Sequence, residues 1–220
     1  MKVAIFDFDG TIYKNETYSF MMDFLKTHEE YNGKYKSFYY SIVPPYVGYK
    51  LRLYPERRMK ASLTQKYLNV FHGLKFDKVK AYFEELAAKM RDDFHPLVLE
   101  QMLEHEKKDH LIMVVSGTYK PLLEAALEYL PVDIIIGTDI PTNNHIVDAK
   151  MPIDHVQADR KAELILEKLK HKAIDWKNSF AYGDSISDLP VFEMVGNPVA
   201  VCPDVKLQQI ANRRNWKVIC

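Results

Sequence analysis

The order of short apolar runs along this chain limits its fold more than any other feature of the sequence. Each run has the length of a strand, and amphipathic stretches with helical spacing separate most of them. Alternating strands and helices predict an α/β protein, in which helices cover both faces of a parallel sheet. The predicted strands are Val3–Phe8, Leu111–Val115, Asp133–Gly137, Ser179–Tyr182 and Val199–Cys202, with Trp216–Ile219 as a weaker sixth.

Amphipathic stretches between these runs predict the helices that cover the sheet. Pro96–Lys108 and Pro121–Leu130 each place leucines on one stripe, as a helix that packs on a sheet does. A third helix is predicted to begin at Asp159, which would serve as its N-cap. The segment Thr138–Lys150 contains turn-forming residues and is expected to be an extended hairpin or a loop.

The interval between the first two predicted strands is far longer than the others. Residues 9–110 fill it, and a structureless connection of that length is rare in a compact domain. Residues 15–93 are therefore predicted to form a helical cap that is inserted after the first strand. The core domain would then consist of residues 1–14 and 94–220. Pro44 and Pro45 are expected to separate two cap helices at a hinge or turn. The predicted parts of this helical cap are Tyr18–His28, a tyrosine-rich stretch near Lys34–Tyr49, Glu56–Phe71 and Asp77–Met90.

Composition argues against several classes of protein. The 220 residues carry 30 Lys and Arg against 30 Asp and Glu, so no general attraction to nucleic acid or to an anionic membrane is expected. Two cysteines, Cys202 and Cys220, cannot form a disulfide scaffold and favour a reducing, cytoplasmic setting. The N-terminus meets Asp7 too early for a signal peptide, and no window approaches the ~20 apolar residues of a spanning helix. Membrane insertion is therefore not expected, and the oligomeric state is left open.

Two carboxylates follow the first predicted strand, in the run Asp7-Phe8-Asp9-Gly10-Thr11. Residues two apart on a strand point to the same side, so both acids would leave the sheet edge where parallel sheets bind ligands. Adjacent carboxylates repel each other, and a hard cation such as Mg²⁺ would relieve that repulsion. An acidic turn that ends in glycine would give the same run without a metal.

Two later segments bring groups suited to binding an anion. Ser116-Gly117-Thr118 ends the second predicted strand and would place a hydroxyl and backbone N–H groups at a helix N-terminus. Lys161 lies in the first turn of its predicted helix, where the helix macrodipole disfavours a positive charge. A lysine at this position is suited to reaching toward a bound anion. A simple turn and a solvated lysine would explain these two segments without a ligand.

A fourth segment, from Gly183-Asp184 to Asp188, supplies two more carboxylates at a strand–helix junction. A helix-capping arrangement would also place acids there. The four segments nevertheless supply, in order, two acids, a hydroxyl, a lysine and two further acids. Since the local explanations would all have to hold at once, a shared phosphate and metal site is the stronger interpretation.

Together these residues resemble the four motifs of the haloacid dehalogenase superfamily, over essentially the whole chain. The helical insert between the first two motifs resembles the phosphoserine-phosphatase-like subgroup. The resemblance implies a Rossmann-like core with an inserted helical cap, and a cytoplasmic, Mg²⁺-dependent phosphatase. It also implies a small phosphorylated metabolite as the substrate and no nucleic acid partner. The motifs are Asp7-Phe8-Asp9-Gly10-Thr11, Ser116-Gly117, Lys161, and Gly183-Asp184 through Asp188.

The resemblance also implies a role for each motif residue. Asp7 would be the nucleophile that forms an aspartyl phosphate, and Asp9 would act as general acid and then general base. Ser116, Gly117 and Lys161 would bind the transferring phosphoryl oxygens. The implied ligands of Mg²⁺ are Asp7, Asp9 through its backbone carbonyl, Asp184, and Asp188 directly or through water.

Two cap residues bear on the substrate. Glu16 is placed like the glutamate that binds the substrate amino group in phosphoserine phosphatases, although a first-turn helix acid would look the same. The cap arginine that binds the substrate carboxylate is matched by Lys66. Lysine cannot hold a carboxylate bidentately, so phosphoserine specificity is left open.

An alternative function is a phosphoacceptor signalling module without metabolic turnover. Receiver-like domains also use an acidic pocket, a hydroxyl and a lysine on a parallel sheet. They lack an acid two residues after the acceptor and carry no cap of this size. Asp9 and the long insert therefore favour the enzyme.

The cap segment Lys26–Lys66 is unusually basic and aromatic. It carries nine Lys and Arg against three acids, together with seven tyrosines. A polyanionic substrate, an anionic lipid surface or single-stranded nucleic acid would suit such a segment. Solvated basic residues around an aromatic cap core would give the same composition.

Overall fold

A parallel sheet of six strands forms the core of the computed structural model, which describes all 220 residues. The strand order is β3-β2-β1-β6-β7-β8, and every neighbouring pair is parallel. The α/β class predicted from the sequence is confirmed, including the sixth strand. The strands are β1 (Val3–Phe6), β2 (Leu111–Tyr119), β3 (Ile134–Thr138), β6 (Phe180–Gly183), β7 (Asn197–Val201) and β8 (Lys217–Ile219).

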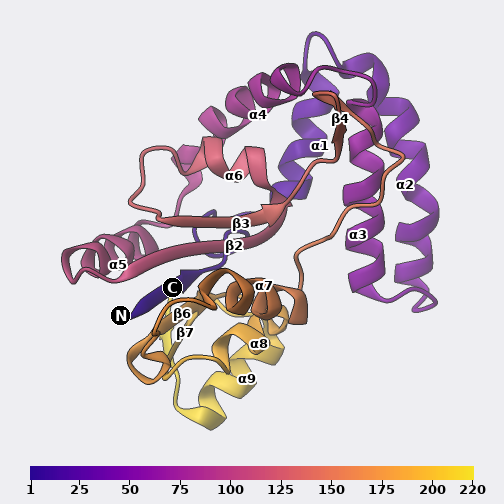
Figure 1. The fold of residues 1–220 in the computed structure, drawn as a ribbon. Coiled ribbons are helices and arrows are strands. Elements are labelled where there is room, and N and C mark those ends of the chain that lie inside the picture. Colours follow the sequence, from indigo (N-terminus) through magenta and orange to yellow (C-terminus); the bar gives the residue numbers. More distant parts are fainter.

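Helices cover both faces of this sheet because its strands are apolar on both sides. In β1, Val3 and Ile5 pack into one buried cluster, while Ala4 and Phe6 pack into the other. Figure 1 shows α5 and α6 on one side of the sheet and α7, α8 and α9 on the other. The bounds are α5 (Pro96–Lys107), α6 (Lys120–Ala126), α7 (Asp159–Leu169), α8 (Leu189–Phe192) and α9 (Val205–Arg214).

Two core boundaries differ from the predicted ones. β2 continues past Val115 to Tyr119 because, after a shift in register, Tyr119 pairs with Thr138 of β3. The segment expected as a turn before a helix thus lies in the last part of a strand. The N-cap of α7 is Ala158, and Asp159 is the first helical residue, where a carboxylate interacts favourably with the helix dipole.

Four helices occupy the interval between β1 and α5, at the positions where cap helices were predicted (Figure 1). They are α1 (Thr17–Thr27), α2 (Tyr35–Lys50), α3 (Glu56–Tyr67) and α4 (Phe76–Met90). Short 3₁₀ turns complete the chain at Asn32–Lys34, Leu68–Val70, Arg91–Asp93, Trp176–Asn178 and Ile186–Asp188. One buried cluster runs from Phe6 of the sheet to Tyr67 and Phe83 of these helices. The division into a cap of residues 15–93 and a core of residues 1–14 and 94–220 stays a proposal.

The insert is held to the core at several places. At the crossing, Lys14 donates a backbone hydrogen bond to Asp93 (3.1 Å), and His95 donates one to Ile12 (2.8 Å). The segment expected as a hairpin or a loop is a hairpin, with β4 (Thr142–Asn143) antiparallel to β5 (Ile146–Val147). Gly73 of the insert donates to Val147 of this hairpin (2.9 Å).

The expectation that Pro44 and Pro45 separate two helices is wrong, because both lie inside α2. Each proline removes one backbone hydrogen bond from the helix. Tyr40 and Pro44 lie on the exposed side, so water can satisfy the carbonyl that Pro44 leaves free. On the other side, Phe38 and Ile42 are buried in the apolar cluster of the insert. This packing holds α2 together as one helix.

Cys202 and Cys220 form a disulfide that joins the end of β7 to the last residue of the chain. A single disulfide does not make a disulfide scaffold, so the chain is still excluded from that class of protein. The pair no longer favours a reducing compartment, since disulfides persist in oxidising ones. None of the helices combines the length and the apolar character that crossing a membrane requires.

Candidate active site

A cavity of about 260 Å³ lies where the carboxyl ends of β1 and β2 meet helices α1 and α3. Ligands of parallel sheets bind at this end of the strands. Seven of the predicted site residues line the cavity, whereas Asp188 lies just beneath its floor and Lys66 lies outside it. The seven are Asp7, Asp9, Glu16, Ser116, Gly117, Lys161 and Asp184.

A buried lysine between two carboxylates forms the floor of the cavity. The Lys161 ammonium donates to a carboxylate oxygen of Asp7 and to one of Asp188, both at 2.6 Å. All three side chains are nearly inaccessible to solvent. Asp7 directly follows β1, and Lys161 stands in the first turn of α7, so the packing of α7 on the sheet brings them together.

The floor carries more negative charge than one lysine balances. Burial raises the pKa of Asp7 well above its usual range, and the neighbouring Asp188 raises it further. The pKa of Asp184 is raised to about 7 by burial and by Asp188. Burial alone would lower the pKa of Lys161, but Asp188 and Asp7 raise it. A second positive charge at this place would be stabilised.

The acids of the floor fit a divalent cation. Asp7, Asp184 and Asp188 each offer a carboxylate oxygen within 4.8 Å of the other two. Two glycines let the backbone come close: a Cβ on Gly10 would overlap Asp184 Oδ2, and one on Gly183 would lie 2.7 Å from Asp188 Oδ2. Oxygen ligands from one or a few carboxylates are what Mg²⁺ prefers.

Asp9 faces a different set of partners from Asp7. Its carboxylate accepts hydrogen bonds from the Thr17 backbone N–H (2.7 Å) and from the Thr118 hydroxyl (2.9 Å). The Ser116 hydroxyl is 3.4 Å from the same carboxylate. The side chain of Asp9 is therefore held at the junction of β1, β2 and α1, beside the floor rather than in it.

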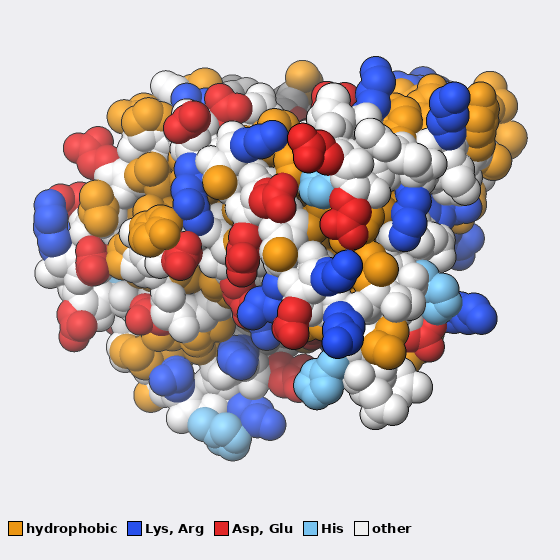
Figure 2. All heavy atoms as spheres, turned by 90° about the horizontal axis from the view of Figure 1, so that it is seen from above, with side chains coloured by type: hydrophobic (Ala, Val, Ile, Leu, Met, Phe, Trp, Pro, Cys, Tyr) orange, Lys and Arg blue, Asp and Glu red, His pale blue; other side chains and the backbone are white.

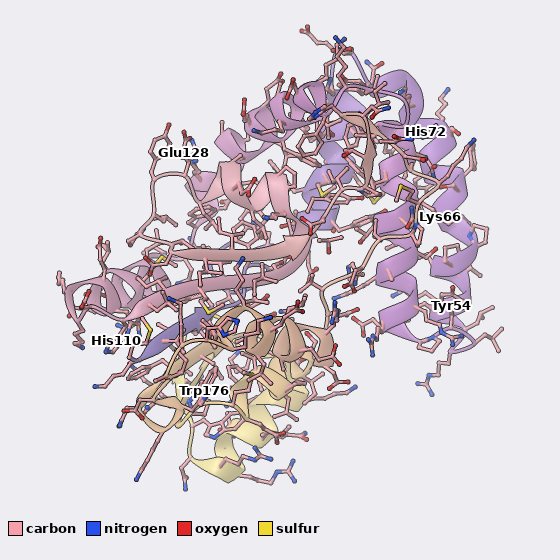
Figure 3. The ribbon with its side chains drawn as sticks, viewed as in Figure 1. Tyr54, Lys66, His72, His110, Glu128 and Trp176 are labelled. Atoms are coloured by element: carbon pink, nitrogen blue, oxygen red, sulfur yellow. A yellow bond between two sulfur atoms is a disulfide. The ribbon has the colours of Figure 1, made fainter.

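Sequence reasoning missed several residues of the cavity wall. Lys60 of α3 and His155 line the cavity, although no sequence motif assigned a role to either residue. Lys66 is on the same helix as Lys60 but lies next to the C-terminal end of α3, far from the turn that holds Tyr54 (Figure 3). Burial raises the pKa of Glu16, while the charge of Lys60 lowers it. Glu16 and Lys60 thus form the charged part of the wall opposite the floor.

Three polar atoms of the wall have no hydrogen-bond partner. They are Oγ1 of Thr17, the hydroxyl oxygen of Tyr18 and Oε1 of Gln157, and all three residues line the cavity. Buried polar atoms are usually paired, so unpaired ones in a cavity wall are suited to a bound molecule. No local pattern in the sequence marks these residues.

The sequence model of the haloacid dehalogenase-like hydrolases matches residues 4–193 of this chain. Among curated proteins, an inhibition of morphological differentiation protein of Streptomyces azureus is 26% identical over 166 residues, which are 74% of this chain and 57% of that protein. Phosphoserine phosphatase SerB1 of Mycobacterium tuberculosis is 25% identical over 137 residues, 62% of this chain and 43% of that protein. The chain thus spans about half the length of these curated relatives.

Solved structures share the fold along the whole chain. A protein of unknown function from Bordetella pertussis aligns with a TM-score of 0.80 at 19% identity, covering 100% of this chain and 98% of that one. A substrate-bound phosphoserine phosphatase aligns with a TM-score of 0.64 at 18% identity, covering 99% and 92%. At such identities the likeness concerns the fold, and it matches the Rossmann-like core with inserted helices.

Proposed function

Because the chain belongs to the haloacid dehalogenase-like hydrolase family, we propose that it hydrolyses the phosphate monoester of a small phosphorylated metabolite. The family expected from the four sequence motifs is thereby confirmed. The observation that carries the proposal is the cavity floor, where Lys161 joins Asp7 and Asp188 at 2.6 Å beside Asp184. A phosphate group needs a nucleophile together with positive charge, and this floor offers both.

Asp7 is the proposed nucleophile. One of its carboxylate oxygens attacks phosphorus in line, the bond from phosphorus to the ester oxygen breaks, and an aspartyl phosphate forms. Asp9 gives a proton to the departing oxygen, and then takes one from the water that attacks phosphorus. The bond from phosphorus to the Asp7 oxygen breaks in this second step, which restores the Asp7 carboxylate and releases inorganic phosphate. The hydrogen bonds from Thr17 and Thr118 orient Asp9 for these transfers.

The remaining floor residues bind the phosphoryl group. Lys161 supplies positive charge to its oxygens, and the Ser116 hydroxyl and the Gly117 backbone N–H donate hydrogen bonds to them. Asp7, Asp184 and Asp188, with the backbone carbonyl of Asp9, are the proposed ligands of Mg²⁺. The bound ion would neutralise charge on the phosphate oxygens.

The wall opposite the floor is proposed to hold the rest of the substrate. Glu16 stays a proposed contact for a positively charged group, and Lys60 takes the place at the cavity that the resemblance implied for Lys66. Curated relatives include proteins named phosphoserine phosphatase and histidinol-phosphatase. A small metabolite that carries both a phosphate and an amino group is therefore the first class of substrate to test. The cytoplasmic location stays a prediction.

The test is phosphate release by the purified chain, first from an aryl phosphate and then from a panel of phosphorylated metabolites that includes phosphoserine. We expect turnover that EDTA abolishes and Mg²⁺ restores. Mg²⁺ should also raise the melting temperature, and Asp184→Asn should reduce that rise, which reports binding without turnover. Absence of turnover together with an aspartyl phosphate that lasts for hours would favour the phosphoacceptor module instead.

A further inference from the structure

Exposed apolar side chains gather on the outer side of α2 and on the turn that follows it. Seven of the sixteen large hydrophobic residues exposed in the whole chain fall within residues 39–53. Leu53, Tyr40 and Leu51 are the most exposed of the seven, at 78%, 72% and 63%. We call this set the α2 face, and its members are Tyr39, Tyr40, Val43, Tyr46, Val47, Leu51 and Leu53.

The part of the α2 face that lies on α2 is a stripe on a helix that is apolar on two sides. At 100° per residue, Tyr40, Val43 and Val47 fall within an arc of about 60°. Phe38 and Ile42 lie on the opposite side of α2 and are buried in the cluster of the insert. The buried side accounts for the folding of α2, whereas nothing in the fold accounts for the outer side. Contiguous apolar residues on a surface mark an interaction site.

Positive charge surrounds the α2 face. Lys36, Lys50, Arg52, Arg57 and Arg58 lie on α2, on the turn and at the start of α3, and no acid occurs between Tyr31 and Pro55. None of the five basic residues forms an ion pair within the chain, and the nearest acid, Glu56, pairs with Lys60 instead. Figure 2 shows hydrophobic and basic side chains next to one another at the right-hand edge of the molecule, where α2 lies.

We propose that the α2 face docks the protein on the surface of an anionic membrane. Tyrosine rings prefer the headgroup region, and basic side chains beside them are attracted to anionic lipids by ~1 kcal/mol each. Leu51 and Leu53, at the tip of the α2–α3 turn, would enter the boundary between headgroups and acyl chains. A second copy of this chain suits the face poorly, since its own basic residues would meet like charges. The net charge of the whole chain is zero, so attraction to an anionic membrane has to come from a local patch such as this face.

Docking at this face would bring the cavity close to the membrane. The α2–α3 turn leads directly into the part of α3 that lines the cavity with Met59 and Lys60. Arg57, between the turn and these residues, is close enough for its charge to lower the pKa of His155 in the cavity wall. The first part of α3 therefore connects the α2 face to the cavity wall.

The test is cosedimentation of the full chain with vesicles of equal parts phosphatidylglycerol and phosphatidylcholine, beside vesicles of phosphatidylcholine alone. We expect binding to the anionic vesicles only, weakening as salt is added. The double variant Leu51→Ser with Leu53→Ser should bind about tenfold more weakly, and Lys50→Glu with Arg52→Glu at least about tenfold more weakly. The matched control is Leu103→Ser with Leu166→Ser, two exposed leucines on core helices, which should bind like the wild type.

Three results would overturn the docking proposal. One is no sedimentation of the wild type with anionic vesicles, and another is an equal loss of binding in the leucine control. The third is a wild-type dimer, seen by sedimentation velocity, that Leu51→Ser with Leu53→Ser dissociates, because the face would then join two copies. Melting temperatures check that each variant is folded. Vesicle binding is measured without substrate, so it succeeds or fails independently of phosphatase activity.

Discussion

The two sides of the cavity differ in how tightly their charged groups are held. On the floor, Asp7, Lys161 and Asp188 are buried and joined by hydrogen bonds. On the opposite wall, Glu16 is exposed, Lys60 is half-buried, and the two do not form an ion pair, while the Tyr18 hydroxyl has no partner. A rigid, charged floor suits one fixed reaction, whereas a wall with unsatisfied polar groups suits the selection of a substrate.

The largest effect is expected from Asp7→Asn on the floor. The amide cannot attack phosphorus, so kcat for an aryl phosphate should fall by at least about 10³-fold. The free energy of unfolding should not fall, because the change removes one of two crowded carboxylates and Lys161 keeps Asp188. Phosphate release and thermal denaturation measure the two quantities.

The exposed Asp77→Asn serves as the control for this change and should keep full activity. If Asp7→Asn turned over substrate at the wild-type rate, the covalent mechanism would be wrong. The floor could then no longer be described as the side of the cavity that carries out the reaction.

The next largest effect is expected from Lys161→Met, measured as stability. Removing the ammonium leaves Asp7 and Asp188 buried without their shared partner, so the free energy of unfolding should fall by about 3–5 kcal/mol. Denaturant unfolding at pH 7 measures the loss. Lys168→Met, an exposed position on the same helix, should change stability little. Equal losses in the two variants would show that the floor is not held by this lysine.

A smaller effect concerns His155, at the border between the two sides. Burial, with the charges of Lys60 and Lys161, lowers its pKa to about 4. As the pH falls from about 6.5 to 4, the unfolded chain binds a proton that the folded chain does not. The free energy of unfolding should therefore fall by about 2–3 kcal/mol across this window because of His155.

In His155→Gln this part of the acid sensitivity should disappear. A remainder should persist, because burial also lowers the pKa of His105 to about 4. His171→Gln, at an exposed position, is the control and should keep the whole wild-type dependence. Denaturant unfolding at a series of pH values compares the three proteins, and identical pH dependence in all of them would contradict the assignment.

The floor was predictable from the sequence and the wall was not, for a physical reason. Parallel strands end at one edge, so residues at the carboxyl ends of β1, β2 and β6 had to meet there. Asp7 and Asp184 directly follow β1 and β6, Ser116 lies in the last part of β2, and all three line one cavity. The wall depends on how α3 is rotated about its axis above that edge. Lys60 and Lys66 are six residues apart, which on a helix differ in direction by about 120°, so only one of them faces the cavity.

Packing also overrode a local rule in the insert. Two prolines in succession predict a break in a helix, yet α2 continues because buried Phe38 and Ile42 hold it on one side. The same exposed side that lets water reach the freed carbonyl carries the α2 face. A local sequence pattern shows neither which element a helix packs against nor the direction from which that element approaches. For that reason the insert was predicted as helical, but its geometry was not.

The smallest effect separates the two lysines of α3. Lys60→Ala removes a charge from the cavity wall, so KM for the preferred substrate should rise about 5–10-fold with little change in kcat. Lys66→Ala should leave both constants unchanged, since Lys66 does not line the cavity. Steady-state kinetics on the best substrate of the panel measure the difference. If Lys66→Ala raised KM and Lys60→Ala did not, the family resemblance would identify the substrate-binding lysine better than the lining of the cavity does. The substrate-binding wall would then have to include the C-terminal end of α3.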